Sequence, residues 1–145
     1  MQTKIVTLCY TYSCMKKGFK SNIEVDTTNN TYFRKVLYTG AHSQLVLMTL
    51  QPGEEIGLEV HDDTDQFFRF EAGIGKVVID DTTHDVADGD AVIVPAGAQH
   101  NVVNMSATET LHMYTIYSPA HHKDKTVHAT KADEEEEEFD GVTTE

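Results

Sequence analysis

The middle of this chain consists of short apolar runs separated by turn residues, and this pattern strongly limits the fold. One run covers 45–50 and is closed by Pro52 and Gly53. The other expected strands cover 66–70, 76–80, 91–94 and 111–117. Runs of this length, spaced about 8–12 residues apart, are typical of a β-sandwich or barrel. Helical periodicity of useful length is missing before residue 130, so we expect an all-β fold.

Two segments within these runs have a fixed spacing of glycine, proline and polar residues. The first reads Gly53-x5-Glu59-x-His61-x4-Gln66-x6-Gly73. The second reads Gly89-x5-Pro95-x-Gly97-x2-His100-x3-Asn104. Agreement in spacing across two long motifs is far more specific than a match to one short motif.

With these residues the chain resembles the cupins, whose motifs read G-x5-H-x-H-x3/4-E-x6-G and G-x5-P-x-G-x2-H-x3-N. The second motif matches at every defined position, and the first matches in all its spacings. Glu59 stands where the family usually has histidine, and Gln66 where it usually has glutamate. The resemblance covers about residues 34–119, and it is to small single-domain cupins of the mannose-6-phosphate-isomerase-like type. It implies a double-stranded β-helix barrel with a metal site.

The ligands implied by the resemblance are Glu59, His61, Gln66 and His100. Alternate residues of a strand leave the same face, so Glu59 and His61 point the same way. The carboxylate has changed position, but the set still holds one negative ligand, which favours a retained site. We therefore expect one divalent transition metal (manganese, iron, zinc or nickel) with open positions for a small molecule.

Alternation along the strands of Gln66 and His100 also predicts which side chains face the barrel interior. The predicted substrate-pocket residues are Phe68, Phe70, Val102 and Asn104, with core filling as the alternative for the phenylalanines. Phe67 and Arg69 are expected to face outward. Arg34 and Arg69 are the only arginines, which disfavours a phosphorylated substrate. The residues considered and left without a catalytic role are Tyr38, His112, Tyr114 and Tyr117.

We divide the chain into an N-terminal extension (1–14), the barrel with its metal site (15–119) and a polar segment (120–145). Thr130, with Asp133 three residues on, predicts a capped short helix over 131–138, followed by an acidic tail. The residues expected in a solvated loop, away from any metal, are His121, His122 and His128. Segment 1–14 and everything after Lys131 are therefore expected to be dispensable for metal binding and assembly.

The composition limits the partners. The formal net charge of −13 disfavours nucleic acid and anionic membranes. No apolar stretch approaches the roughly 20 residues of a membrane span. The two cysteines, Cys9 and Cys14, form no disulfide framework, which favours a cytoplasmic protein. Family resemblance and an outward Phe67 favour a homodimer, with 32–38 as a second contact.

Three functions remain open from the sequence. The first is a metal-dependent isomerase, lyase or hydrolase acting on a small oxygenated or sugar-like metabolite. The second is a non-haem iron dioxygenase, because two histidines and one carboxylate suit that metal. The third is a non-catalytic metal- or ligand-binding module. Fold alone does not select among them.

Overall fold

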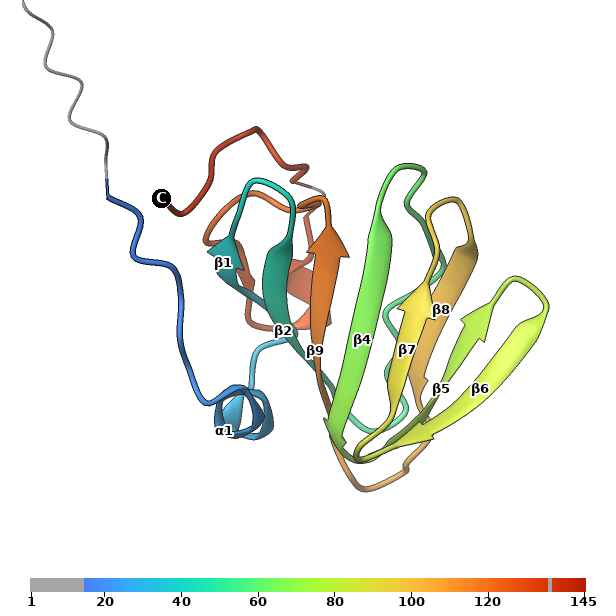
Figure 1. Cartoon of the computed structure of the whole chain (residues 1–145). Helices are drawn as coiled ribbons and strands as arrows, with labels where there is room; N and C mark the ends of the chain where they lie inside the picture. Colours follow the sequence, from blue (N-terminus) through green and yellow to red (C-terminus); the bar gives the residue numbers. More distant parts are fainter. Residues whose placement is uncertain (1–14, 136) are drawn as a thin grey trace, which may run out of the picture.

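Two antiparallel sheets make up most of the computed structural model, which describes residues 15–135 and 137–145. The expected extension 1–14, with Cys9 and Cys14, lies outside the described residues. The six-stranded sheet has the order β10 (Val127–His128), β1 (Arg34–Thr39), β2 (Gln44–Leu50), β9 (Leu111–Ser118), β4 (Asp65–Ala72), β7 (Ala91–Val94). The four-stranded sheet has the order β3 (Glu59–Val60), β8 (Gln99–Asn104), β5 (Ile74–Ile79), β6 (Thr82–Ala87). The all-β prediction is confirmed, and Figure 1 shows β1 and β2 at one side and the β5–β6 hairpin at the other.

The core lies between the two sheets and follows from alternation along their strands. In β4, Gln66, Phe68 and Phe70 are buried, while Phe67 and Arg69 are only half-buried. From the smaller sheet, Val77 and Val102 join the same apolar cluster. The inward and outward faces predicted for β4 are therefore correct, and burial of large apolar side chains is the main stabilising contribution.

A short helix, α1 (Ile23–Asn29), lies before the first strand and was not expected from the sequence. Its N-cap is Asn22, whose side-chain oxygen accepts a hydrogen bond from the Val25 N–H at 3.3 Å. Glu24 and Asp26 lie in its first turn, where negative charge suits the helix dipole. Seven residues are too few to give a clear helical period, so the cap and the acidic first turn were the available signals. No helix in the described part of the chain has the length and apolar character of a membrane span.

The segment after β9 folds back onto the barrel. β10 extends the larger sheet beside β1, and His122 pairs with Glu138 in an antiparallel bridge. Near its end, the Thr144 N–H donates to the Thr39 carbonyl at 2.9 Å. Figure 1 shows this segment, in red, returning over the β1–β2 side of the barrel. It is exposed along much of its length, yet it contacts the barrel at these places, while its expected dispensability stays a prediction.

The predicted helix after Thr130 is shorter than expected. The Asp133 carboxylate accepts hydrogen bonds from the N–H and the hydroxyl of Thr130, at 2.9 and 2.8 Å, so the predicted cap is present. The helix itself is a 3-10 turn over Lys131–Asp133. Beyond it Glu134 turns toward the barrel and binds Arg34, which places part of the acidic segment at the site described next.

Candidate metal centre

The four predicted ligands come from three strands and one turn at the same end of the barrel. Glu59 on β3 is the register partner of His100 on β8, so hydrogen bonding of the two strands places these side chains together. His61 follows β3 directly, and its carbonyl accepts the Gly97 N–H at 2.8 Å. The turn at residues 95–97 of the second motif thereby holds the backbone of His61, the histidine of the first motif, in place. Gln66 enters from β4 and is fully buried.

The ligand atoms of these side chains converge. Oε2 of Glu59 lies 3.4 Å from Nε2 of His61 and 3.8 Å from Nε2 of His100. Nε2 of His100 lies 3.1 Å from Oε1 of Gln66. Neighbouring ligands bonded at about 2.1 Å to one ion are separated by about 3 Å in octahedral and 3.4 Å in tetrahedral geometry. The observed separations therefore suit a single ion among Glu59, His61 and His100, with Gln66 beside His100.

Hydrogen bonding on the far side of two ligands leaves their lone pairs facing each other. Nδ1 of His100 lies 3.1 Å from the Ala98 carbonyl, which can only accept, so we assign the proton to Nδ1. The amide nitrogen of Gln66 donates to the Thr115 hydroxyl at 3.1 Å, which turns Oε1 toward His100. Two acceptor atoms then face each other, an arrangement that a cation between them would stabilise.

His61 provides a second test of whether the residues present fit a metal ion. Its Nε2 is buried and has no hydrogen-bond partner among the described residues, although Glu59 lies nearby. Buried polar atoms are almost always satisfied, so an unpaired ring nitrogen beside a carboxylate needs a partner. A divalent ion would satisfy His61, His100, Gln66 and Glu59 together, so the residues present fit a metal.

The charge states of the ligands also suit a cation. Burial opposes ionisation of Glu59, but the neighbouring His61 ring and the charge of Arg34 outweigh it, so the pKa of this carboxyl is lowered. Burial lowers the pKa of His100, against a weaker opposite effect of the Ala98 carbonyl. Near neutral pH Glu59 is therefore an anion and His100 a neutral imidazole, the forms that bind metals.

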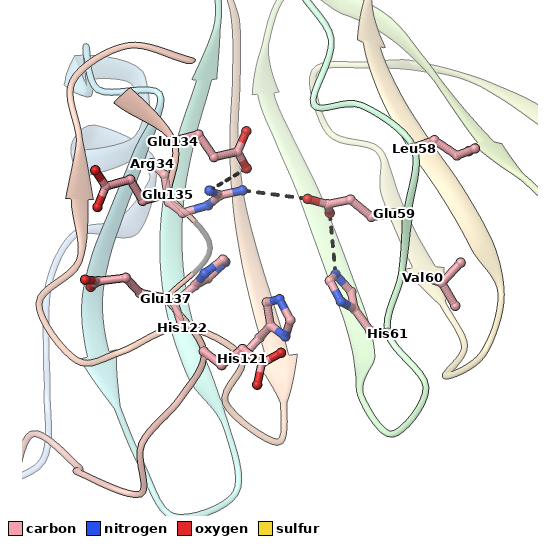
Figure 2. Close-up of a pocket in the computed structure, with 11 residues that line it drawn as sticks. Arg34, Leu58, Glu59, Val60, His61, His121, His122, Glu134, Glu135 and Glu137 are labelled. Carbon is pink, nitrogen blue, oxygen red and sulfur yellow. Dashed lines mark hydrogen bonds and ion pairs between the residues drawn. The ribbon is translucent and has the colours of Figure 1, made fainter. Parts of the chain in front are cut away.

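A cavity of about 310 Å³ opens beside the centre (Figure 2). The residues that line it, among those the structure describes, are Arg34, Leu58, Glu59, Val60, His61, His121, His122, Glu134, Glu135, Glu137 and Glu138. Figure 2 shows Glu59 and His61 on one wall, facing Arg34, His121 and Glu134 on the other. The second wall is built largely by β1 and the C-terminal segment, outside both sequence motifs.

The expectation that His121, His122 and His128 lie in a solvated loop is wrong. His122 and His128 are each only 7% exposed, and the His121 ring lies 4.1 Å from that of His61. The chain reaches this place because Tyr117 on β9 is the register partner of Gln66. The residues that follow Tyr117 therefore start at the end of the barrel where the predicted ligands lie. A correct prediction of the pairing between β4 and β9 would have placed His121 and His122 near this site.

Burial keeps the histidines of this wall neutral. It lowers the pKa of His121, with His61 acting in the same direction. Burial, followed by the charge of Arg34, lowers the pKa of His122 to about 2. Nε2 of His122 lies 3.2 Å from the Tyr117 hydroxyl, and burial raises the pKa of that phenol. The wall therefore presents a neutral imidazole, His121, next to a buried phenol–imidazole pair.

The predicted substrate-pocket residues do not line this cavity. Phe68, Phe70 and Val102 are fully buried in the core between the sheets. Asn104 is also buried, and its amide donates to the carbonyls of Leu50, Gln51 and Glu109, at 3.0, 3.0 and 2.9 Å. These side chains point inward as expected, but they lie deeper along their strands than the metal ligands. The structure therefore favours core filling and loop anchoring for the four residues.

Comparison with known proteins agrees with this architecture. The model of the cupin domain family matches residues 46–117, which include all four predicted ligands. The chain belongs to the cupin superfamily. The predicted double-stranded β-helix is thereby confirmed, while the likeness to mannose-6-phosphate isomerases is not.

Two curated relatives of this cupin carry names that assign no activity. The uncharacterized protein YrkC of Bacillus subtilis (strain 168) is 46% identical over 81% of the chain. The uncharacterized protein L612 of Acanthamoeba polyphaga mimivirus is 43% identical over 70%. The chain spans 66% and 65% of these relatives, just under two thirds of their length. The crystal structure of BH2720 from Bacillus halodurans is 43% identical, with a TM-score of 0.79 over 81% of this chain and 92% of that one.

Proposed function

We propose that this cupin binds one divalent transition metal through Glu59, His61, Gln66 and His100 and acts on a small oxygenated metabolite. The observation that carries the proposal is the pair of acceptor atoms that face each other at His100 and Gln66, beside the buried His61 Nε2 that has no hydrogen-bond partner among the described residues. A bound divalent ion would polarise a carbonyl or hydroxyl of the metabolite.

The residues around the centre favour proton-transfer chemistry, such as isomerisation, elimination or hydrolysis. His121 lies on the cavity wall beside His61 and carries a neutral imidazole, so it is the candidate that could take a proton from a bound molecule. Glu59 and Arg34 bear opposite charges across the same space, with Oε1 and Nη2 3.9 Å apart, and can orient a polar ligand. Leu58 and Val60 provide apolar contact at the rim.

A dioxygenase is the second candidate, because two histidines and one carboxylate are also the ligands of many non-haem iron oxygenases. A non-catalytic binding module is the third. The identity of the co-purified metal and oxygen consumption in the presence of candidate substrates separate the three. Manganese, zinc or nickel without oxygen use supports the first. Iron with oxygen uptake supports the second, and absence of metal supports the third.

His121 is expected to act on the ligand and not to hold the metal. Replacement of His121 by glutamine should leave the metal content within about twofold of the parent protein, because the four expected ligands remain in place. The matched replacement His61→Gln removes a ligand from the same stack of rings and should lower metal content severely. Elemental analysis of both variants checks this. Equal metal loss in the two variants would make His121 a ligand and remove it as the candidate proton acceptor.

Assembly and location stay predictions of the same proposal. We expect a homodimer, no nucleic-acid partner and a cytoplasmic protein. The structural reason for a dimer through Phe67 is weaker than the sequence suggested, because this side chain is half-buried and its ring lies 6.2 Å from that of Tyr114.

A further inference from the structure

Arg34 is a buried cation whose hydrogen-bonding capacity is only partly used. It begins β1, is 1% exposed and lies on the wall of the cavity opposite Glu59. Nη1 donates to Oε1 of Glu134 at 2.8 Å and lies 3.4 Å from Nδ1 of His128. Nε and Nη2 have no hydrogen-bond partner in the described part of the chain. Unsatisfied donors on a buried guanidinium are costly, so they point to a missing acceptor.

We propose that Arg34 recognises a carboxylate on the ligand of the metal centre, and that Glu134 occupies this place until the ligand displaces it. The inference rests on the proposed function for the location of the ligand. The ligand class is a small organic acid with a second oxygen, a hydroxyl or carbonyl, able to reach the metal.

The chemistry of the guanidinium favours a carboxylate. Its planar fork of donors matches two carboxylate oxygens, and such bidentate pairs are stronger than neutral hydrogen bonds. Glu134 already demonstrates that a carboxylate fits against Nη1. Among the described residues that line the cavity, Glu59 is the one carboxylate on the barrel side, and its Oε1 lies 3.9 Å from Nη2 of Arg34. Once Glu134 is displaced, the charge of Glu59 alone does not balance a divalent ion and a guanidinium, so the loaded centre attracts a further anion.

Glu134 is suited to be displaced because its environment differs from that of Arg34. Its side chain is 27% exposed, and it follows the short 3-10 turn on a largely exposed segment. The other carboxylates at the cavity, Glu135, Glu137 and Glu138, belong to the same segment. These three carboxylates line the cavity without pairing with Arg34, and in this proposal they leave it with Glu134 when the segment is displaced. Figure 2 shows Arg34 between Glu134 and Glu59, joined to both by dashed lines.

The test compares lactate with lactamide, its neutral amide analogue, on protein loaded with manganese and checked for metal content. Binding is measured by calorimetry for the parent chain, Glu134→Ala and Glu137→Ala. Glu137 is the matched control, because it is removed from the same segment but pairs with Lys123 at 3.8 Å and not with Arg34. We expect Glu134→Ala to bind lactate about tenfold more tightly, the size of one hydrogen bond to a charged group, and Glu137→Ala to stay within about twofold. Lactamide should bind equally to all three.

A second variant separates recognition from simple opening of the cavity. In the Glu134→Ala background, Arg34→Lys should lose most of the gain for lactate while lactamide binding is unchanged, with folding checked by thermal melting. The proposal is overturned if Glu134→Ala binds lactate no better than the parent, if lactamide gains as much, or if millimolar lactate does not bind at all. If manganese does not load, the proposed function fails. The same titrations on the metal-free protein then test Arg34 alone, with preference for lactate over lactamide still expected in Glu134→Ala.

Discussion

Replacement of both His61 and His100 by alanine is expected to abolish stoichiometric metal binding. The two histidines supply two of the four converging ligand atoms, and the remaining Glu59 and Gln66 offer one carboxylate and one neutral amide oxygen. Loss of a residue that only supports a ligand typically costs 10–100-fold in metal affinity, so we expect a loss of more than about 100-fold here. Metal per chain is measured by elemental analysis after dialysis against a weak chelator.

The control for this double variant is His42→Ala with His84→Ala. Both of these histidines are exposed and neither belongs to the converging group, so the control removes equal imidazole content without touching the site. Undiminished metal in the His61 and His100 variant would refute the assignment of these ligands. Equal loss in the control would show that the metal is held on the surface.

The carboxylate is expected to contribute more than the amide. Glu59→Gln should weaken metal binding by about 100-fold, and Gln66→Ala by about tenfold, because a charged oxygen contributes more to a divalent ion than a neutral one. Glu59 also lies 3.9 Å from Arg34, so the replacement removes the negative charge between the bound metal ion and the Arg34 guanidinium, which are both positive. Metal affinities from competition with a coloured chelator test the order.

Gln66→Glu is the companion variant. A second carboxylate at this buried position should tighten a hard cation, since the amide is already turned toward the centre by Thr115. If Gln66→Ala costs as much as Glu59→Gln, the idea that the negative ligand has moved from one motif position to another is wrong.

The sequence could predict that Glu59 and His100 meet at the candidate centre, because their positions follow strand geometry. Glu59 and His100 are register partners across β3 and β8, and spacing within each motif fixes the face on which they lie. The motif glycines are also explained. Gly73 has a φ of +92°, and a Cβ there would collide with the Thr110 carbonyl, so the position tolerates no side chain without strain. Local rules of alternation and turn geometry are enough for these features.

The other wall of the cavity could not be predicted by the same rules. Arg34, His121 and Glu134 lie outside both motifs and meet only through the tertiary fold, with 100 positions separating Arg34 from Glu134. A run of glutamates has no periodicity that distinguishes a solvated tail from a segment held by one buried arginine. For Phe68 and Phe70, alternation gave the correct direction, but it carries no information on depth along the barrel, which decides between core and cavity.

The metal content of full-length protein purified without a histidine tag tests the proposed centre most directly. We predict about one divalent transition metal per chain, held at a centre with one carboxylate, two imidazoles and one amide, and lost in the His61 and His100 variant. Protein that is folded, contains no metal and takes up none of manganese, iron, zinc or nickel on incubation would contradict it.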